Sequence, residues 1–339
     1  MALGMLAGSV WRPLPLLLSR RAAGTIPTAT RSTDSAPESP VGATVPMVDA
    51  HRSPSDDRDP DAGAIIRWST AVGHIDVAGV PRSYLTLRPL LSSSASLPMV
   101  IVLHGRRGSP GQIERLTGIQ QVVGPAIFVF PAGYRHSWNA GGCCGTAHAA
   151  GINDIAFLST LPQRVLAGLH DPAPHAVYLM GFSNGGRMAY EMACAHPRRW
   201  AGIAVVEAVP AASCPSPVAV PMVIIANRHD PFYSMSRPGK VVQGYVQQSM
   251  AASVEHWRRL EGCHGRPLAL RLGNTTVERW DSCSGTATFT YAVYPQAGHF
   301  WPHTDGRSPG ASRLIWSAWH DRSSRLATRH VKELTSPSL

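Results

Sequence analysis

The chain has 339 residues, of which 44% are hydrophobic, and its 31 lysines and arginines outnumber 21 aspartates and glutamates, giving a formal net charge of +10. This length and apolar content suffice for one large α/β domain or two small ones. The basic residues are scattered, without a basic helix or an aromatic-interleaved cluster, so the sequence argues against nucleic-acid binding.

The two ends of the chain predict segments outside the folded domain. Residues 11–18 are apolar, but they contain prolines and precede the charges at Arg20 and Arg21, the reverse of the order in a signal peptide. From residue 25 to about 62 the chain is rich in Pro, Ser, Thr, Ala and Asp, which is typical of disorder. We expect 1–62 to be a leader or linker, 63–321 to be one folded domain and 322–339 to be a polar, basic tail. No apolar run reaches the roughly 18 residues needed for a transmembrane segment.

Within the predicted domain, apolar runs and helical spacing define the elements. The strands are expected near 72–77, 82–88, 98–103, 126–130, 176–181, 202–207, 221–226 and 288–294. The helices are expected near 110–122, 152–168, 184–196, 240–261 and 311–320. The last helix but one has an apolar stripe for core packing, formed by Val242, Tyr245, Val246, Met250, Val254 and Trp257. The pattern predicts an α/β fold, with an antiparallel first strand pair and a mostly parallel sheet covered by helices on both faces.

Ser183 is the most informative single residue. It lies between Gly181 and Gly185 in a G-x-S-x-G pattern, after the apolar run 176–180 and before the helical pattern 187–195. Strand, sharp turn and helix form the context in which this motif exposes a nucleophilic serine. We expect side chains at the two glycines to collide with the neighbouring strand and helix. The alternative is a glycine-rich loop that enters an ordinary helix.

A nucleophilic serine needs a base and a group that orients the base. Asp230 follows the apolar run 220–226, and His299 follows the run 288–294 and a glycine. Their order after Ser183 is the order of the acid and the histidine in α/β-hydrolases. The alternatives are a turn-forming Asp before Pro231 and an ordinary surface histidine.

Two backbone N–H groups are expected to form an oxyanion hole, one from Asn184 and one from the loop after strand 98–103. Arg106 is the expected second donor, because Gly105 lets the backbone approach the site. We interpret His104, in the same loop, as a structural residue rather than a second base.

Four passages resemble the polyhydroxybutyrate depolymerase-like and feruloyl esterase-like branch of the α/β-hydrolases. They are 102–109, 138–145 with 153–154, 181–186 and 298–302. The resemblance covers about residues 70–320, and Trp-Asn-Ala-Gly-Gly-Cys-Cys-Gly at 138–145 is its most specific part. Asn153-Asp154 and Gln296-Ala297 depart from the family pattern, in places that affect the shape of the site rather than the triad.

The resemblance implies an α/β-hydrolase catalytic domain that hydrolyses esters through an acyl-enzyme, without a cofactor or metal. The implied substrates are short-chain acyl esters, hydroxybutyrate oligomers, or feruloyl or acetyl esters. Trp138 and Trp301 are the aromatic candidates for a substrate wall, and the alternative for Trp138 is a structural stacking residue. A serine peptidase and a catalytically dead binding protein on the same fold are the alternatives. The oligomeric state stays open.

The six cysteines give information about the cellular location of the protein. All six lie between residues 143 and 283, and Cys263 and Cys283 flank the segment 266–280, which reads as a variable excursion between helix and strand. We expect these two to form a disulfide, whereas the other four allow three pairings. Disulfides favour a secreted or cell-envelope location, and buried thiols in the cytoplasm are the alternative.

Overall fold

The computed structural model describes residues 66–91, 96–169, 172–239, 241–242 and 245–320. The predicted leader at 1–62 and the predicted tail at 322–339 lie outside the described residues, so both stay predictions. Among the described helices, none has the length and apolar character required to cross a membrane.

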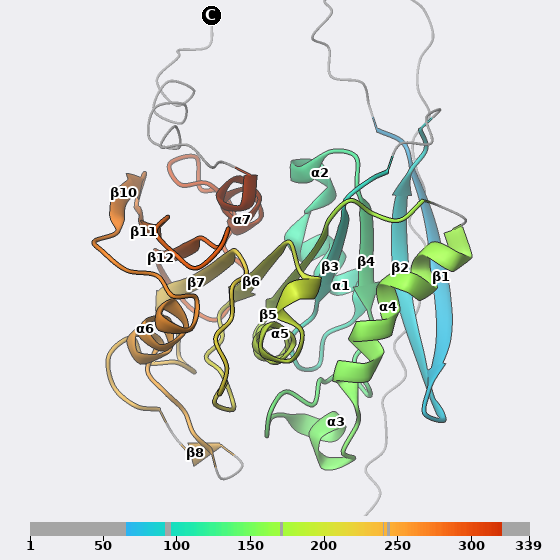
Figure 1. Ribbon diagram of the computed structural model, residues 1–339, viewed down its shortest axis with the longest axis horizontal. Helices are drawn as coiled ribbons and strands as arrows, with labels where there is room; N and C mark the ends of the chain where they lie inside the picture. Colours follow the sequence, from blue (N-terminus) through green and yellow to red (C-terminus); the bar gives the residue numbers. More distant parts are fainter. Residues whose placement is uncertain (1–65, 92–95, 170–171, 240, 243–244, 321–339) are drawn as a thin grey trace, which may run out of the picture. The chain divides into compact units, whose positions relative to one another are not determined.

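A single sheet of ten strands organises the described part of the chain (Figure 1). Its order is β1-β2-β4-β3-β5-β6-β7-β12-β11-β10. The strands are β1 (Trp68–Val77), β2 (Val80–Pro89), β3 (Met99–Leu103), β4 (Ile127–Pro131), β5 (Val177–Phe182), β6 (Gly202–Val206), β7 (Met222–His229), β10 (Leu268–Leu272), β11 (Thr275–Trp280) and β12 (Phe289–Ala297).

The central strands β4, β3, β5, β6, β7 and β12 are parallel, and antiparallel strands flank them on both sides. This arrangement confirms the predicted fold class, including the antiparallel pairing of β1 with β2. The expected excursion between helix and strand at 266–280 contains two strands that were not predicted. The segment forms the hairpin β10–β11, in which Gly273 and Asn274 make a two-residue turn and Gly273 has a φ of 60°.

Helices cover both faces of the sheet. They are α1 (Pro110–Thr117), α2 (Gln120–Val123), α3 (Gly145–Ala149), α4 (Asp154–Leu169), α5 (Asn184–Ala195), α6 (Met250–Leu260) and α7 (Ala311–His320), with a 3₁₀ turn at Pro197–Arg199. Buried residues of α4, α5 and α6 form a core on one face, and those of α1 and α7 form a second core on the other. The parallel strands between them are fully buried, which explains their continuous apolar sequences.

The predicted helix at 240–261 is too long. α6 begins at Met250, where the Ser249 hydroxyl caps the helix by accepting a hydrogen bond from the Ala252 N–H at 3.1 Å. The residues before it form a small hairpin of β8 (Val241–Val242) and β9 (Tyr245–Val246). Val246 is exposed, so this member of the predicted stripe does not belong to the core.

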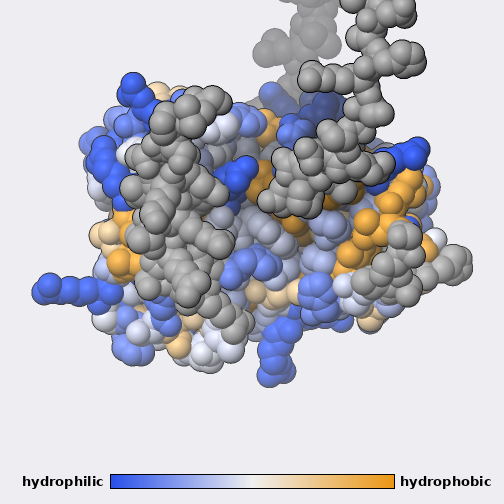
Figure 2. Space-filling model, turned by 90° about the horizontal axis from the view of Figure 1, so that it is seen from above, coloured by the Kyte–Doolittle hydropathy of each residue, from blue (hydrophilic) through white to orange (hydrophobic). Residues whose placement is uncertain are grey.

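Hydrophilic and apolar residues share the visible surface. On the face shown in Figure 2, the most hydrophilic residues are spread around the described part of the chain and alternate with apolar ones, rather than forming one patch.

Candidate active site

Ser183 lies at the turn between β5 and α5 and has the backbone conformation of a nucleophile elbow. Its φ is 55°, a left-handed value that is uncommon for a residue with a side chain. A Cβ atom at Gly181 would lie 2.1 Å from the carbonyl oxygen of Gly185, and one at Gly185 would lie 2.5 Å from that of Leu103. Both flanking positions therefore require glycine, one because of the helix and the other because of the end of β3.

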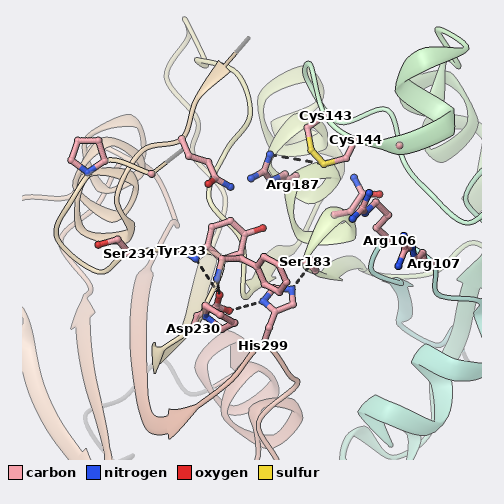
Figure 3. A pocket seen from close by; sticks show the side chains of 17 residues that line it. Arg106, Arg107, Cys143, Cys144, Ser183, Arg187, Asp230, Tyr233, Ser234 and His299 are labelled. Carbon is pink, nitrogen blue, oxygen red and sulfur yellow. Dashed lines mark hydrogen bonds and ion pairs between the residues drawn. A yellow bond between two sulfur atoms is a disulfide. The ribbon is translucent and has the colours of Figure 1, made fainter. Parts of the chain in front are cut away.

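The structure brings Ser183, His299 and Asp230 together from three different strand ends (Figure 3). Nε2 of His299 lies 2.8 Å from Oγ of Ser183, and Nδ1 lies 2.5 Å from Oδ2 of Asp230. Because Nδ1–H donates to the carboxylate, Nε2 is left to accept the serine proton. The Asp230 side chain is only 3% exposed, and that of His299 is 15% exposed.

Backbone and side-chain contacts hold the acid and the histidine loop. Oδ1 of Asp230 accepts hydrogen bonds from the N–H groups of Phe232, at 2.6 Å, and of Tyr233, at 3.1 Å. The buried Asn227 donates from Nδ2 to the carbonyls of Gly298 and Phe300, at 3.2 and 3.1 Å. These bonds tie the ends of β7 and β12 together, so the imidazole and the carboxylate keep their relative position.

Glu207 is a member of the site that the sequence analysis missed. It directly follows β6, is fully buried, and accepts a hydrogen bond from the N–H of Asn227. Atoms of Glu207, Asp230 and His299 lie within 4.8 Å of one another. Burial, the hydrogen bond to Asp230 and the charge of that residue raise the pKa of Glu207 to about 11, so its carboxyl is neutral and donates to Asp230.

The pKa of Asp230 moves in the opposite direction. Burial alone would raise it, but the hydrogen bonds from His299 and Glu207 outweigh that effect and hold the pKa below its usual value. Asp230 is therefore anionic at neutral pH. A signal for Glu207 was present in the sequence, because an acidic residue directly after a buried strand is the same pattern that identified Asp230.

The two expected oxyanion donors lie at the elbow. Among the described residues, neither the N–H of Arg106 nor that of Asn184 has an accepting partner. A Cβ atom at Gly105 would lie 3.2 Å from Cβ of Ser183, so the loop that carries Arg106 approaches the serine closely. Both N–H groups are thus available to a ligand beside Ser183.

His104 is buried beneath this loop. Its Nδ1 lies 2.7 Å from the Gly105 carbonyl, and its Nε2 accepts a hydrogen bond from the Gly133 N–H at 2.9 Å. Burial lowers its pKa to about 4, so the ring is neutral and both nitrogens are used within the fold. This is the structural role that the sequence analysis expected.

A cavity of about 940 Å³ opens above the triad. Its aromatic lining comes from Phe232 and Tyr233, and Arg106, Arg107 and Arg187 also line it (Figure 3). The residues that line the pocket come from the loops after β3, β7 and β12, from the passage 143–145, from Gln247 and from the first turn of α5.

Trp138 and Trp301 do not form a substrate wall, and Trp138 has the structural role that was its alternative. Both are at most 1% exposed, and neither lines the cavity. The Trp138 indole N–H donates to the His104 carbonyl at 2.8 Å, and that of Trp301 donates to the Ser312 hydroxyl at 3.1 Å. Because each indole finds its partner inside the core, both residues pack the fold instead of facing a substrate.

The passage 138–154 folds around a buried ion pair. Arg82 of β2 donates to Asp154 of α4 at 2.7 Å, and both side chains are at most 2% exposed. The second carboxylate oxygen of Asp154 accepts the Asn139 N–H at 2.7 Å. The Asn184 side chain exchanges two hydrogen bonds with the backbone of Trp138, at 2.8 and 3.0 Å, so the same passage is also fixed to the elbow.

All six cysteines are paired. Cys263 is joined to Cys283, as expected, and the remaining pairs are Cys194–Cys214 and the adjacent residues Cys143–Cys144. The adjacent pair lines the cavity above Ser183. Three disulfides in the folded part of the chain are typical of proteins from oxidising compartments.

No protein-family model matches the chain. It is 28% identical over 264 residues to a protein named "Putative esterase NocK" from Nocardia uniformis subsp. tsuyamanensis, covering 69% of this chain and 74% of that protein. Solved structures with a related fold include an acetyl xylan esterase from Aspergillus awamori, with 14% identity, a TM-score of 0.48 and coverage of 68% of this chain and 94% of that one. A feruloyl esterase module from Clostridium thermocellum has 13% identity and a TM-score of 0.47, with coverage of 74% and 87%.

The fold assignment rests on the strand order and on the elbow of this chain. A mostly parallel sheet carries Ser183 on a strained turn between a strand and a helix, and Asp230 and His299 follow in the order typical of these hydrolases. The chain has the α/β-hydrolase fold, and its sequence is similar to that of the protein named "Putative esterase NocK".

Proposed function

We propose that this protein is a serine esterase that hydrolyses carboxylic esters. The observation that carries the proposal is the chain of hydrogen bonds from Ser183 through His299 to Asp230, placed at the opening of a cavity. This geometry fits a nucleophile, a general base and an orienting acid. The sequence similarity to a protein named as an esterase agrees with the same chemistry.

In the proposed mechanism, His299 takes the Ser183 proton while the serine oxygen attacks the ester carbonyl. The N–H groups of Asn184 and Arg106 stabilise the tetrahedral oxyanion. The imidazolium, stabilised by Asp230, then protonates the leaving alcohol, and a water molecule activated by His299 releases the acid from the acyl-enzyme.

Substrates of different acyl length test this proposal. We expect wild-type protein to hydrolyse at least one of p-nitrophenyl acetate, butyrate, octanoate and methyl ferulate, and Ser183→Ala to hydrolyse none. The order of rates distinguishes a short-chain acyl pocket from a feruloyl pocket, and hydroxybutyrate oligomers extend the same series. Folded wild-type protein that hydrolyses none of them and also resists an active-site fluorophosphonate would leave a binding role on the same fold.

The disulfides lead us to propose a secreted or cell-envelope location. Fractionation of cells that express the full chain tests it. The proposal fails if the protein is found in the cytoplasm with free thiols.

A further inference from the structure

Arg187 is a buried cation at the proposed active site. It lies in the first turn of α5, the helix that begins directly after Ser183. Arg187 is only 2% exposed, yet it lines the cavity above the serine (Figure 3). A guanidinium keeps its charge in a protein, so burial makes a partner for that charge necessary.

No carboxylate serves as this partner among the residues that the structure describes. The ion pairs of that part of the chain do not include Arg187, and Nε of Arg187 has no hydrogen-bond partner there. Its polar contacts are with neutral groups: Nη1 lies 4.0 Å from Sγ of the disulfide-bonded Cys144, and the guanidinium also hydrogen-bonds to the Tyr233 hydroxyl. The guanidinium carbon also lies 5.6 Å from the centre of the Tyr233 ring.

These neighbours are neutral. Burial raises the pKa of Tyr233, so its phenol keeps its proton at neutral pH, and a disulfide carries no charge. The one carboxylate that lines the cavity is Asp230, whose oxygens are already bonded to His299 and to two backbone N–H groups.

Two further arginines add to the positive charge of the cavity. Arg106 and Arg107 are exposed and line it as well, whereas Asp230 is the only acidic lining residue. A cavity with this charge balance attracts anions, and a guanidinium fork matches the geometry of a carboxylate.

We propose that the natural substrate is an ester that carries a carboxylate close to the scissile bond, and that Arg187 binds this carboxylate. The proposal rests on the esterase function proposed above and specifies its substrate class. Because Arg187 and Ser183 line the same cavity, the carboxylate can belong to either the acyl or the alcohol half of the ester.

Pairs of esters that differ only in charge test the proposal. For the acyl half, monoethyl succinate is compared with its neutral amide isostere, ethyl succinamate. For the alcohol half, acetoxyacetate is compared with 2-acetoxyacetamide. In one of the two pairs we expect wild-type kcat/KM to be at least about tenfold higher for the carboxylate, the size of effect that a charge-assisted hydrogen bond supports.

Variants connect this preference to one side chain. Arg187→Met should lower kcat/KM for the carboxylate ester about 10- to 100-fold more than for its amide partner, and Arg187→Lys should give an intermediate ratio. Arg164→Met is the matched control, because Arg164 is exposed on α4 and does not line the cavity. This control should leave the ratio unchanged.

Inhibition of the wild-type protein gives a second readout that does not depend on any variant folding. Succinamate should inhibit hydrolysis of p-nitrophenyl acetate at least about tenfold more strongly than succinamide, its neutral counterpart. The proposal is overturned if wild-type protein hydrolyses the amide esters but has no higher kcat/KM for the carboxylate ester in either pair. It is also overturned if Arg187→Met lowers kcat/KM equally for both esters of each pair. Failure of the esterase function itself looks different, because then no ester is hydrolysed and Ser183 is not labelled.

Discussion

Glu207 and Asp230 place their carboxyl groups against each other beneath His299, with one atom of each of the three residues within 4.8 Å of the others. When two carboxyl groups are buried this close together, ionising both is unfavourable because their negative charges repel each other. The pair therefore keeps a proton. That proton is on Glu207, since its pKa is raised to about 11 while the pKa of Asp230 is lowered. Glu207 therefore acts as a neutral donor that positions the acid of the proposed triad.

Replacing Glu207 with leucine should remove this donor. We expect kcat for p-nitrophenyl butyrate to fall about tenfold, because a hydrogen bond to a charged group is lost. The pKa of Asp230 should rise without the donor, so activity should be lost at a higher pH on acidification than in the wild type. The measurement is kcat and kcat/KM between pH 4 and 9.

Glu207→Gln is the matched variant, because its amide N–H can replace the donor. It should recover most of the activity and shift the acidic limb back towards the wild-type position. If the leucine and glutamine variants show the same pH profile, Glu207 serves the fold rather than the proposed triad. In that case the variants should have lower melting temperatures than the wild type.

Buried carboxyl groups also make stability depend on pH. Burial raises the pKa of Glu261 to about 8, whereas an unfolded chain has a Glu pKa of about 4.3. The folded state thus keeps a proton that the unfolded state releases, so this contribution is complete below about pH 4 and is lost as the pH rises towards 8. Between pH 5 and 8 the free energy of unfolding should fall by up to about 1.4 kcal/mol per pH unit for each such group.

Urea unfolding at pH 5 and pH 8 measures this dependence. Glu261→Gln keeps an acceptor for the Val220 N–H and removes the titration, so the stability of this variant should decline less over the same range. Glu278→Gln, at an exposed position of β11, is the control. Equal pH dependence of Glu261→Gln and wild type would contradict the assignment of the proton.

The sequence predicted the central sheet and the candidate nucleophile because their signals are local. Five-residue apolar runs define the buried parallel strands, and glycines at 181 and 185 are required by contacts within a few residues of the turn or at the end of β3. The hairpin β10–β11 also had a local signal, since two strand-like runs are separated by Gly273-Asn274. No strand was expected there, because that turn signal was not used.

Other features depend on contacts between distant parts of the chain. Trp138 is an aromatic residue in a glycine-rich passage, and only the assembled core shows that its indole bonds to His104 instead of facing the cavity. The partners of Arg187 are likewise set by loops that lie far from it in sequence, at residues 144 and 233. Periodicity within one element does not report either arrangement.

The ion pair between Arg82 and Asp154 should be important for stability. Asp154→Asn keeps an acceptor for the Asn139 N–H but leaves the buried guanidinium without its anion. We expect the free energy of unfolding, measured by urea denaturation at pH 7, to fall by about 3–5 kcal/mol. The exposed pair of Arg259 with Glu255 provides the comparison, and Glu255→Gln should cost at most about 1 kcal/mol. Similar losses in both variants would mean that the buried pair does not organise the passage 138–154.

The disulfides should differ in what they stabilise. Cys194–Cys214 and Cys263–Cys283 each close a loop with a sequence separation of 20, so replacing either pair by serines should cost about 3 kcal/mol. Cys143–Cys144 joins adjacent residues and restricts the unfolded chain little, but it lines the cavity. Its double serine variant should therefore change KM more than stability. A large loss of stability there, with unchanged KM, would contradict this division.

Phe232 should influence which esters the cavity accepts. Its ring is 63% exposed, lies 4.8 Å from the His299 ring centre to centre in an edge-on arrangement, and lines the cavity. Phe232→Ala should change the free energy of unfolding by no more than about 0.5 kcal/mol, because little surface is buried there. For a substrate with an aromatic group that packs on this ring, kcat/KM of the variant should be about two- to tenfold lower than that of the wild type. For an acetyl ester of a small alcohol, kcat/KM should not change. Comparing methyl ferulate with ethyl acetate in wild type and variant tests this, and an equal loss for both esters would assign Phe232 to the support of His299 instead of to substrate binding.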